Sequence, residues 1–309
     1  MAYLRAFGAY LPARRVRNEE LSALVDATPE WILSATGIEE RRYAAAEDSV
    51  AALGVRAAQD CLQNAGVAGE ELGMILLASG SSERFCPGPA SQVAAELGLS
   101  ATPALDIPVA SCGSLIALAM AAQFAPRVGL VLVIGAEIMS RRIELTPQGK
   151  DTAILFGDGA GACLVDANTG FARIVDFALH TEGAAAEILK IENDRFQMDG
   201  RSVILQASRK IPRAIHEVLE RNGLTANDPA AYLLHQANLN LITRIAASLK
   251  APEDRFYANV SRYGNTSSAS LLIAACEWHR TLSGPLTAPV VFSAFGAGLN
   301  WGALLAVPS

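Results

Sequence analysis

The residue best suited to covalent chemistry is Cys112, which lies within residues 109–115, Val-Ala-Ser-Cys-Gly-Ser-Leu. A strand-like apolar run ends just before it, and a helix-like run of small and apolar residues begins just after it. A thiol in the first turn of a helix feels the positive end of the helix dipole, which favours the reactive thiolate. Gly113 leaves room for a substrate. The local sequence alone fits a packing cysteine equally well.

Two further polar residues occupy positions from which they could assist a nucleophile. His235 opens the tetrapeptide His-Gln-Ala-Asn at the end of an apolar run, and Asn265 lies in the small-residue segment 263–270. Each also has a simple structural interpretation. A single histidine at a strand end is commonly a hydrogen-bonded core residue, and an asparagine before a helix can serve only as its cap.

Two glycine-rich segments, residues 156–162 and 295–302, superficially resemble phosphate-binding loops. No Lys-Ser/Thr pair follows Gly157, Gly159 and Gly161, and the spacing does not match a dinucleotide fingerprint. We therefore do not expect nucleotide hydrolysis or hydride transfer.

The composition is that of a globular protein with a large core. The 309 residues are 51% hydrophobic and 18% charged, with a net charge of −6. The acidic excess argues against nucleic-acid binding. The N-terminal segment lacks the apolar core of a secretory signal. Residues 107–126 form a long uncharged run, but Pro108, Ser111 and Gln123 favour a strand end and a buried helix over a membrane span. We expect a cytoplasmic protein.

The cysteines give no sign of a disulfide framework or of a zinc site. There are five of them, an odd number, and no two form a Cys-x-x-Cys pair. We expect free thiols and no metal.

Helical and strand-like patterns alternate along the whole chain. In the first half they predict helices at 49–65, 91–97 and 113–124, and strands at 74–80, 105–110, 128–136 and 160–165. In the second half they predict helices at 208–222, 239–249 and 267–280, and strands at 232–238, 289–294 and 302–307. The order of elements repeats, which predicts two similar βα-layered halves, 1–166 and 167–309, that share one interface.

Six segments together resemble the ketoacyl-ACP synthase III family. They are residues 30–42 (Glu-Trp-Ile-Leu-Ser-Ala-Thr-Gly-Ile-Glu-Glu-Arg-Arg), the Cys112 junction, 156–162, 235–238, 264–270 and 295–302. Each is a weak signal alone, but all occur in the family's order, and the likeness extends from about Tyr3 to Val307.

The resemblance implies an α/β protein with the thiolase fold, five layers (αβαβα) made of two similar βα halves. It implies a Cys–His–Asn set of Cys112, His235 and Asn265, in which Cys112 carries the acyl group. The backbone N–H groups of Cys112 and Gly298 would form the oxyanion hole. His235 and Asn265 would donate hydrogen bonds to a malonyl thioester as carbon dioxide leaves. Cysteine proteases share these residue types, but the surrounding motifs favour the synthase. No metal or redox cofactor is implied.

The resemblance also implies a coenzyme A site, with departures from the family. Trp31 matches the residue that stacks on the adenine, while arginines of the family are replaced by Ala35 and Lys150. Lysine keeps the charge but lacks the planar surface of arginine. The cations that could compensate are Arg41, Arg42 and Arg201.

The acyl-primer site shows a second departure. Cys86 lies where acetyl-using relatives carry a phenylalanine, so a longer or bulkier primer is expected, unless Phe85 fills that space. Asn238 completes the implied substrate-binding residues, and the segment 178–196 is shorter than usual.

The expected partners are acyl-CoA, an acyl carrier protein and a second copy of the chain. The carrier-docking patch is weak, because Asn240, Ala247 and Ser248 stand where relatives carry basic residues, although Arg244 and Lys250 lie nearby. The homodimer interface is expected to include the strand 128–136.

Two other functions remain open from the sequence. One is a synthase-like acyltransferase that moves an acyl group from Cys112 to an alcohol or amine. The other is a non-catalytic partner subunit of a related heterodimer. The presence of both His235 and Asn265 argues against each. The sequence does not give the primer length, the malonyl donor or the pathway.

Overall fold

The computed structural model describes residues 1–309, and its centre is a ten-stranded sheet. The strand order is β12 (Phe256–Tyr257), β11 (Ala231–Leu234), β13 (Val290–Gly296), β14 (Asn300–Pro308), β8 (Ala172–Thr181), β1 (Ala2–Tyr10), β7 (Asp158–Asp166), β6 (Leu130–Ile138), β4 (Leu72–Ala78) and β5 (Ala104–Ile107).

The sheet consists of two equivalent sets of five strands, β5-β4-β6-β7-β1 and β12-β11-β13-β14-β8, joined by antiparallel pairing of β1 with β8. In each set the first three strands are parallel and the last two are antiparallel. The repeat of elements predicted from the sequence therefore has a structural counterpart. The division between residues 166 and 167 falls in the connection between β7 and β8, and its meaning as a domain boundary stays a prediction.

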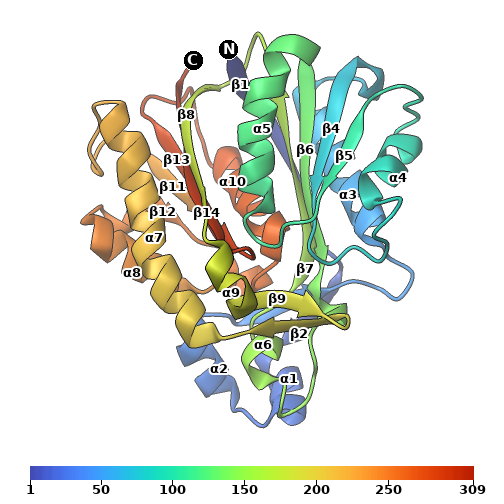
Figure 1. The fold of residues 1–309 in the computed structure, drawn as a ribbon, viewed down its shortest axis with the longest axis vertical. Helices are drawn as coiled ribbons and strands as arrows, with labels where there is room; N and C mark the ends of the chain where they lie inside the picture. Colours follow the sequence, from blue (N-terminus) through green and yellow to red (C-terminus); the bar gives the residue numbers. More distant parts are fainter.

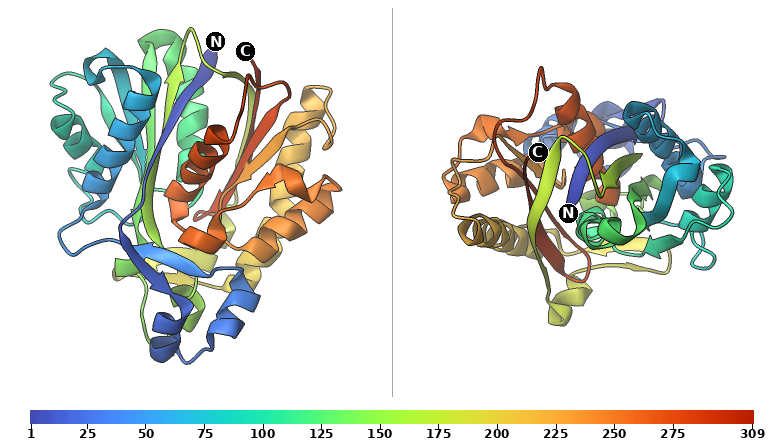
Figure 2. Two further views of the ribbon diagram at one scale, coloured as in Figure 1. Left: turned by 180° about the vertical axis from the view of Figure 1, so that it is seen from behind. Right: turned by 90° about the horizontal axis from the view of Figure 1, so that it is seen from above.

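Helices form the other three layers (Figures 1 and 2). Helices α3 (Val50–Ala65) and α4 (Pro89–Glu96) pack on the first strand set. Helices α5 (Gly113–Val128) and α10 (Ser270–Arg280) lie between the two sets, and α7 (Gly200–Arg221) and α8 (Leu239–Leu249) cover the second. This confirms the five-layered α/β architecture.

Short elements complete the chain. They are β2 (Arg14–Arg17), α1 (Asn18–Val25), α2 (Pro29–Thr36), β3 (Glu40–Tyr43), α6 (Lys150–Ala153), β9 (Leu189–Glu192), β10 (Arg195–Met198), α9 (Val260–Tyr263) and the 3-10 turns η1 (Gly69–Glu71), η2 (Met139–Arg141), η3 (Gly183–Ile188), η4 (Glu253–Arg255) and η5 (Ser267–Ala269). None of the helices combines the length and the hydropathy needed to cross a bilayer.

Several helices and strands differ from their predicted bounds. Helix α7 begins eight residues before the predicted start at 208, because the Asp199 side chain caps it by accepting the Ser202 N–H at 3.1 Å. Strand β11 ends at Leu234, so residues 235–238 form a loop. The segment 267–280 divides into η5 and α10.

The expected dimer interface at residues 128–136 is wrong. Strand β6 lies inside the sheet between β4 and β7, and all nine of its residues are buried within a single chain. The uninterrupted apolar run at residues 130–136 of β6 reflects this burial on both faces. The edge of the first strand set is β5 instead.

The glycines of residues 156–162 allow other segments to approach β7 closely. A Cβ on Gly157 would lie 2.3 Å from the carbonyl oxygen of Tyr263, and one on Gly161 would lie 2.8 Å from the Ile273 nitrogen of α10. These glycines therefore serve packing.

Gly161→Ala should destabilise the fold by about 1–3 kcal/mol, because the added methyl group meets the backbone of α10 and cannot be relieved by a rotamer change. Urea unfolding of the purified variant measures the loss. Gly284→Ala is the matched control, since no atom lies within 4 Å of its added Cβ. Equal unfolding midpoints for the two variants would contradict this account of the segment.

Candidate active site

Cys112 follows a strained turn at the start of α5. Its N–H donates to the Ala110 carbonyl oxygen at 2.8 Å across Ser111, whose φ is +65°. This is the geometry of a γ-turn, in which a non-glycine residue occupies the left-handed region. Such a conformation costs roughly 1–3 kcal/mol and persists only where the surroundings impose it. The turn directs α5 away from the site and leaves Cys112 as its N-terminal cap residue.

The thiol of Cys112 is fully buried, and its Sγ donates to the Ala294 carbonyl oxygen on β13 at 3.8 Å. Burial raises the pKa of this thiol to about 12. The sequence predicted a thiolate favoured by the helix dipole. Cys112 does lie at the start of the helix, as predicted. Its burial, however, raises the pKa, against the effect of the helix dipole, and the resting group is a neutral thiol.

His235 is held by Ser270, the first residue of α10. The Ser270 hydroxyl accepts the Gln236 N–H at 3.0 Å and lies 2.6 Å from His235 Nδ1. Because the hydroxyl has no other acceptor within reach, we infer that it donates its hydrogen bond to Nδ1. The proton of the imidazole ring is then on Nε2. Burial lowers the pKa of His235 to about 4, so the ring is a neutral hydrogen-bond donor at pH 7.

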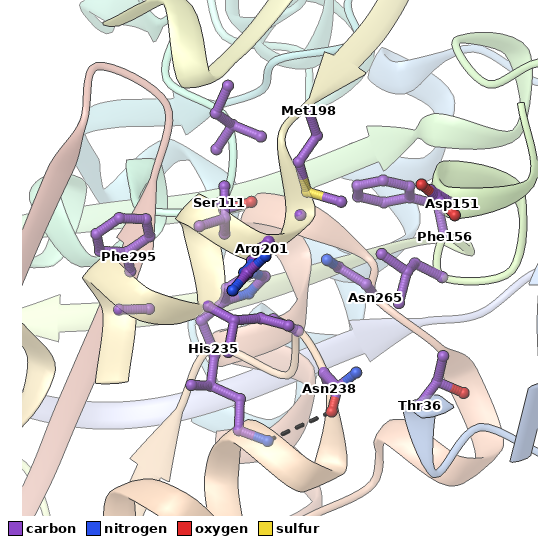
Figure 3. A pocket seen from close by; sticks show the side chains of 18 of the residues that line it. Thr36, Ser111, Asp151, Phe156, Met198, Arg201, His235, Asn238, Asn265 and Phe295 are labelled. Carbon is purple, nitrogen blue, oxygen red and sulfur yellow. Dashed lines mark hydrogen bonds between the residues drawn. The ribbon is translucent and has the colours of Figure 1, made fainter. Parts of the chain in front are cut away.

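Asn265 is fixed through both its backbone and its amide. Its N–H donates to the Leu155 carbonyl oxygen at 2.8 Å, and its own carbonyl accepts the Gly157 N–H at 3.1 Å. The side-chain Oδ1 accepts the Ser267 N–H at 2.9 Å. This bond assigns the oxygen and directs the NH₂ group toward the cavity (Figure 3).

A cavity of about 520 Å³ brings several of the predicted residues together (Figure 3). It is lined by 25 residues, 16 of them hydrophobic, and its polar lining includes Ser111, Arg201, His235, Asn238 and Asn265. An apolar cavity with a few convergent polar groups is the usual form of a small-molecule site. Cys112 follows Ser111 in the chain and is not itself part of the lining.

The two backbone N–H groups predicted to form the oxyanion hole differ in whether they already make a hydrogen bond. The Gly298 N–H makes no hydrogen bond within the chain, and the loop that carries it is tied to the Cys112 turn by the Ala297 N–H, which donates to the Ala110 carbonyl at 3.3 Å. The Cys112 N–H is already engaged by that same carbonyl. Only the Gly298 amide is therefore free in this structure.

Trp31 and Lys150 line a second, shallow depression next to α1. The Lys150 ammonium group lies 5.1 Å from the centroid of the Trp31 ring, which is within cation–π distance. The two residues that the resemblance assigns to the adenine site therefore lie next to each other, and the coenzyme A site stays a prediction. Arg201 lies in the main cavity instead.

Asn238 lines the cavity, but its amide is already used. Its Oδ1 accepts the Asn240 N–H at 2.8 Å as the cap of α8, and its Nδ2 donates to the Ala35 carbonyl at 3.0 Å. This side chain ties α8 to α2 and supports the cavity wall.

Phe85 and Cys86 do not line the cavity of their own chain. Both are exposed on the loop after β4, and the Phe85 side chain is 95% exposed. Sequence reasoning missed Ser267 and Ser270, which position Asn265 and His235. The run of small polar residues in 263–270 was their only signal.

Alkylation of Cys112 by iodoacetamide should accelerate about tenfold per pH unit from pH 7 to pH 9, because the thiolate fraction rises in that proportion below a pKa of about 12. Mass spectrometry of the modified protein measures the rate at this residue. Cys86, which is exposed, is the internal comparison. A rate at Cys112 that reaches a plateau below pH 8 would contradict the neutral resting thiol.

Known proteins are similar to this chain in architecture and in sequence. The family model "3-Oxoacyl-[acyl-carrier-protein (ACP)] synthase III" matches residues 105–183, and its C-terminal counterpart matches residues 219–307. Beta-ketoacyl-[acyl-carrier-protein] synthase III of Oleidesulfovibrio alaskensis is 36% identical over 325 residues, with 98% of each chain covered. The corresponding protein of Aquifex aeolicus is 35% identical over 304 residues, with 96% of each chain covered.

Solved structures agree. The 3-oxoacyl-[acyl-carrier-protein] synthase III from Aquifex aeolicus has a TM-score of 0.95 at 34% identity and covers 99% of this chain and 100% of its own. The priming beta-ketosynthase of the R1128 polyketide pathway has a TM-score of 0.91 at 30% identity, with 100% and 97% covered. Full-length identity above one third, together with the same five layers, establishes that this chain belongs to the 3-oxoacyl-[acyl-carrier-protein] synthase III family.

Proposed function

We propose that this protein condenses an acyl primer, taken from coenzyme A, with a malonyl thioester to give a 3-oxoacyl thioester. The observation that carries the proposal is the pair of neutral donors, His235 and Asn265, in an apolar cavity directly in front of the Cys112 turn. A pair of fixed donors suits an oxygen that becomes negative during the reaction. The proposed chemistry has no step for a metal or a redox cofactor.

In the first half-reaction Cys112 loses its proton and attacks the carbonyl carbon of the primer thioester. The Gly298 N–H stabilises the oxyanion, and the Cys112 N–H contributes once it is shared with the Ala110 carbonyl. The carbon–sulfur bond to coenzyme A then breaks, and coenzyme A leaves with a proton. The result is an acyl group bonded to the Cys112 sulfur.

In the second half-reaction the malonyl thioester places its carbonyl oxygen between His235 Nε2–H and the Asn265 NH₂ group. The bond to the carboxylate carbon breaks, carbon dioxide leaves, and the electron pair forms an enolate that both donors stabilise. The enolate carbon attacks the acyl group, and the Cys112 sulfur leaves and recovers a proton. Because His235 is neutral, it acts here as a donor without transferring its proton.

His235→Ala and Asn265→Ala should each slow decarboxylation of a malonyl thioester by about a hundred- to a thousandfold, since each removes one of two donors to the enolate oxygen. Formation of the acyl-Cys112 adduct should change far less, because neither side chain lies in the proposed oxyanion hole. Carbon dioxide release and adduct mass measure the two steps separately. Loss of acylation with unchanged decarboxylation would contradict these roles and would favour a general-base role for His235 in simple acyl transfer.

We further propose that the malonyl group arrives on an acyl carrier protein that docks along α7. The helix presents Arg201, Leu205, Arg209 and Arg213 on one face at intervals of four residues, and all four are exposed. None of the three arginines forms an ion pair, and Leu205 is 47% exposed. This surface compensates for the weak basic character of α8, and it leads to the cavity through Arg201.

The double variant Arg209→Glu/Arg213→Glu should raise KM for malonyl carrier protein at least about tenfold, because reversed charge opposes the encounter with an acidic partner. KM for malonyl-CoA should change less than about twofold. Arg127→Glu, an exposed site at the far end of α5, is the control. Equal KM changes for both malonyl donors would contradict docking on α7.

A homodimer is the proposed assembly, and the edge strand β5 is its proposed contact. Strand β5 pairs with a neighbouring strand on one side only, and its Leu105 is 45% exposed. In that assembly the exposed loop with Phe85 and Cys86 would affect primer length only through the partner copy. The proposed substrates are thioesters of the cytoplasm, where we expect the enzyme to act.

A further inference from the structure

Glu137 is a buried carboxylate that takes no part in the chemical steps of the proposed reaction. It lies near the end of β6, has no exposed surface and forms no ion pair. A carboxylate buried without a cation is costly unless neutral donors satisfy it fully. It is the one acidic residue in a strand that is otherwise apolar throughout.

Neutral donors surround both oxygens of Glu137. The hydroxyl groups are those of Ser79, at 3.2 Å, Ser81, and Ser267, at 2.8 Å. The backbone donors are Gly80 N–H at 3.1 Å and Ser268 N–H at 3.2 Å. Together they occupy the acceptor sites of an ionised carboxyl group. Three separate segments, the end of β4, the end of β6 and η5, therefore meet at this one group.

Ser267 connects Glu137 to the nucleophile. Its hydroxyl accepts the Ser111 N–H at 3.0 Å and donates its own proton to Glu137 Oε1 at 2.8 Å. The carboxylate thus fixes the direction of the hydroxyl, whose lone pair then holds the amide of the left-handed residue before Cys112. The adjacent Ser268 hydroxyl donates to the Val109 carbonyl at 2.9 Å, so the turn is held on both sides.

Ser267 also connects Glu137 to the second donor of the site. The Ser267 N–H donates to Asn265 Oδ1 at 2.9 Å and so directs the NH₂ group of Asn265. Close approach of η5 to β6 is possible because residue 135 is glycine, where a Cβ would lie 2.3 Å from the Ser268 carbonyl oxygen. One serine thereby relates the position of Asn265 to that of Cys112.

We infer that Glu137 is a positioning residue that acts through Ser267 on the Cys112 turn and on the Asn265 amide together. The inference rests on the proposed function, since it concerns the two half-reactions assigned to those residues. Glu137 touches neither substrate nor reacting atoms. Its role is to hold two arms of the site in one geometry, where a displacement of about 1 Å can cost roughly a hundredfold in rate.

The test compares Ser267→Ala, Glu137→Gln and their double variant by single-turnover acylation of Cys112 and by decarboxylation. Both rates should fall about ten- to hundredfold in each single variant, with KM for acyl-CoA changed less than about twofold. The double variant should be no slower than Ser267→Ala, because the two residues act in series. Rate losses that multiply in the double variant would overturn the inference.

Ser79→Ala is the matched control, because it removes a hydroxyl donor from the same carboxylate without touching Ser111 or Asn265. It should lower the unfolding midpoint about as much as Ser267→Ala while both rates stay within about twofold of the parent. If Glu137→Gln does not fold, the comparison of Ser79→Ala with Ser267→Ala tests the inference by itself. Equal rate losses in Ser79→Ala and Ser267→Ala would overturn the inference, whereas a parent enzyme without condensing activity would refute the proposed function instead.

Discussion

The geometry of the site depends on the left-handed conformation of Ser111, the residue before the nucleophile. That conformation is unfavourable by itself, and the surroundings must impose it. The segment 265–270 supplies the restraint. Asn265 enters the cavity itself, Ser267 holds the Ser111 amide, and Ser270 orients the His235 ring. A single short segment from the second half of the chain thus positions Ser111 in the first half and His235 in the second. The site can exist only where the two strand sets are packed together.

Burial decides the protonation states of the site. Removal from water raises the pKa of Cys112 to about 12 and lowers that of His235 to about 4. Both effects favour the neutral form, so the resting site holds no ion pair between thiol and imidazole. A neutral imidazole with its proton on Nε2 is suited to donate a hydrogen bond to a developing enolate. The same low-polarity surroundings strengthen each fixed donor.

The sequence predicted the α/β class, the order of elements and the repeat, because hydrophobic periodicity reports burial directly. It predicted the set Cys112, His235 and Asn265 only through the resemblance, since these residues lie far apart in the chain. Three features escaped it. The burial of the Cys112 thiol is a tertiary effect that reverses the local helix argument. The edge position of β5 and the interior position of β6 depend on strand order. The basic face of α7 became visible only once its true start at Gly200 was known.

The central claim is that Cys112 carries the acyl group that a malonyl thioester then removes. Intact-protein mass spectrometry tests it most directly, after incubation with acyl-CoAs from acetyl to decanoyl and then with malonyl carrier protein. The account predicts an acyl adduct that is absent in Cys112→Ala and that disappears together with carbon dioxide release and a 3-oxoacyl product. An adduct that malonyl thioesters leave intact, but that an alcohol or amine discharges, would contradict it.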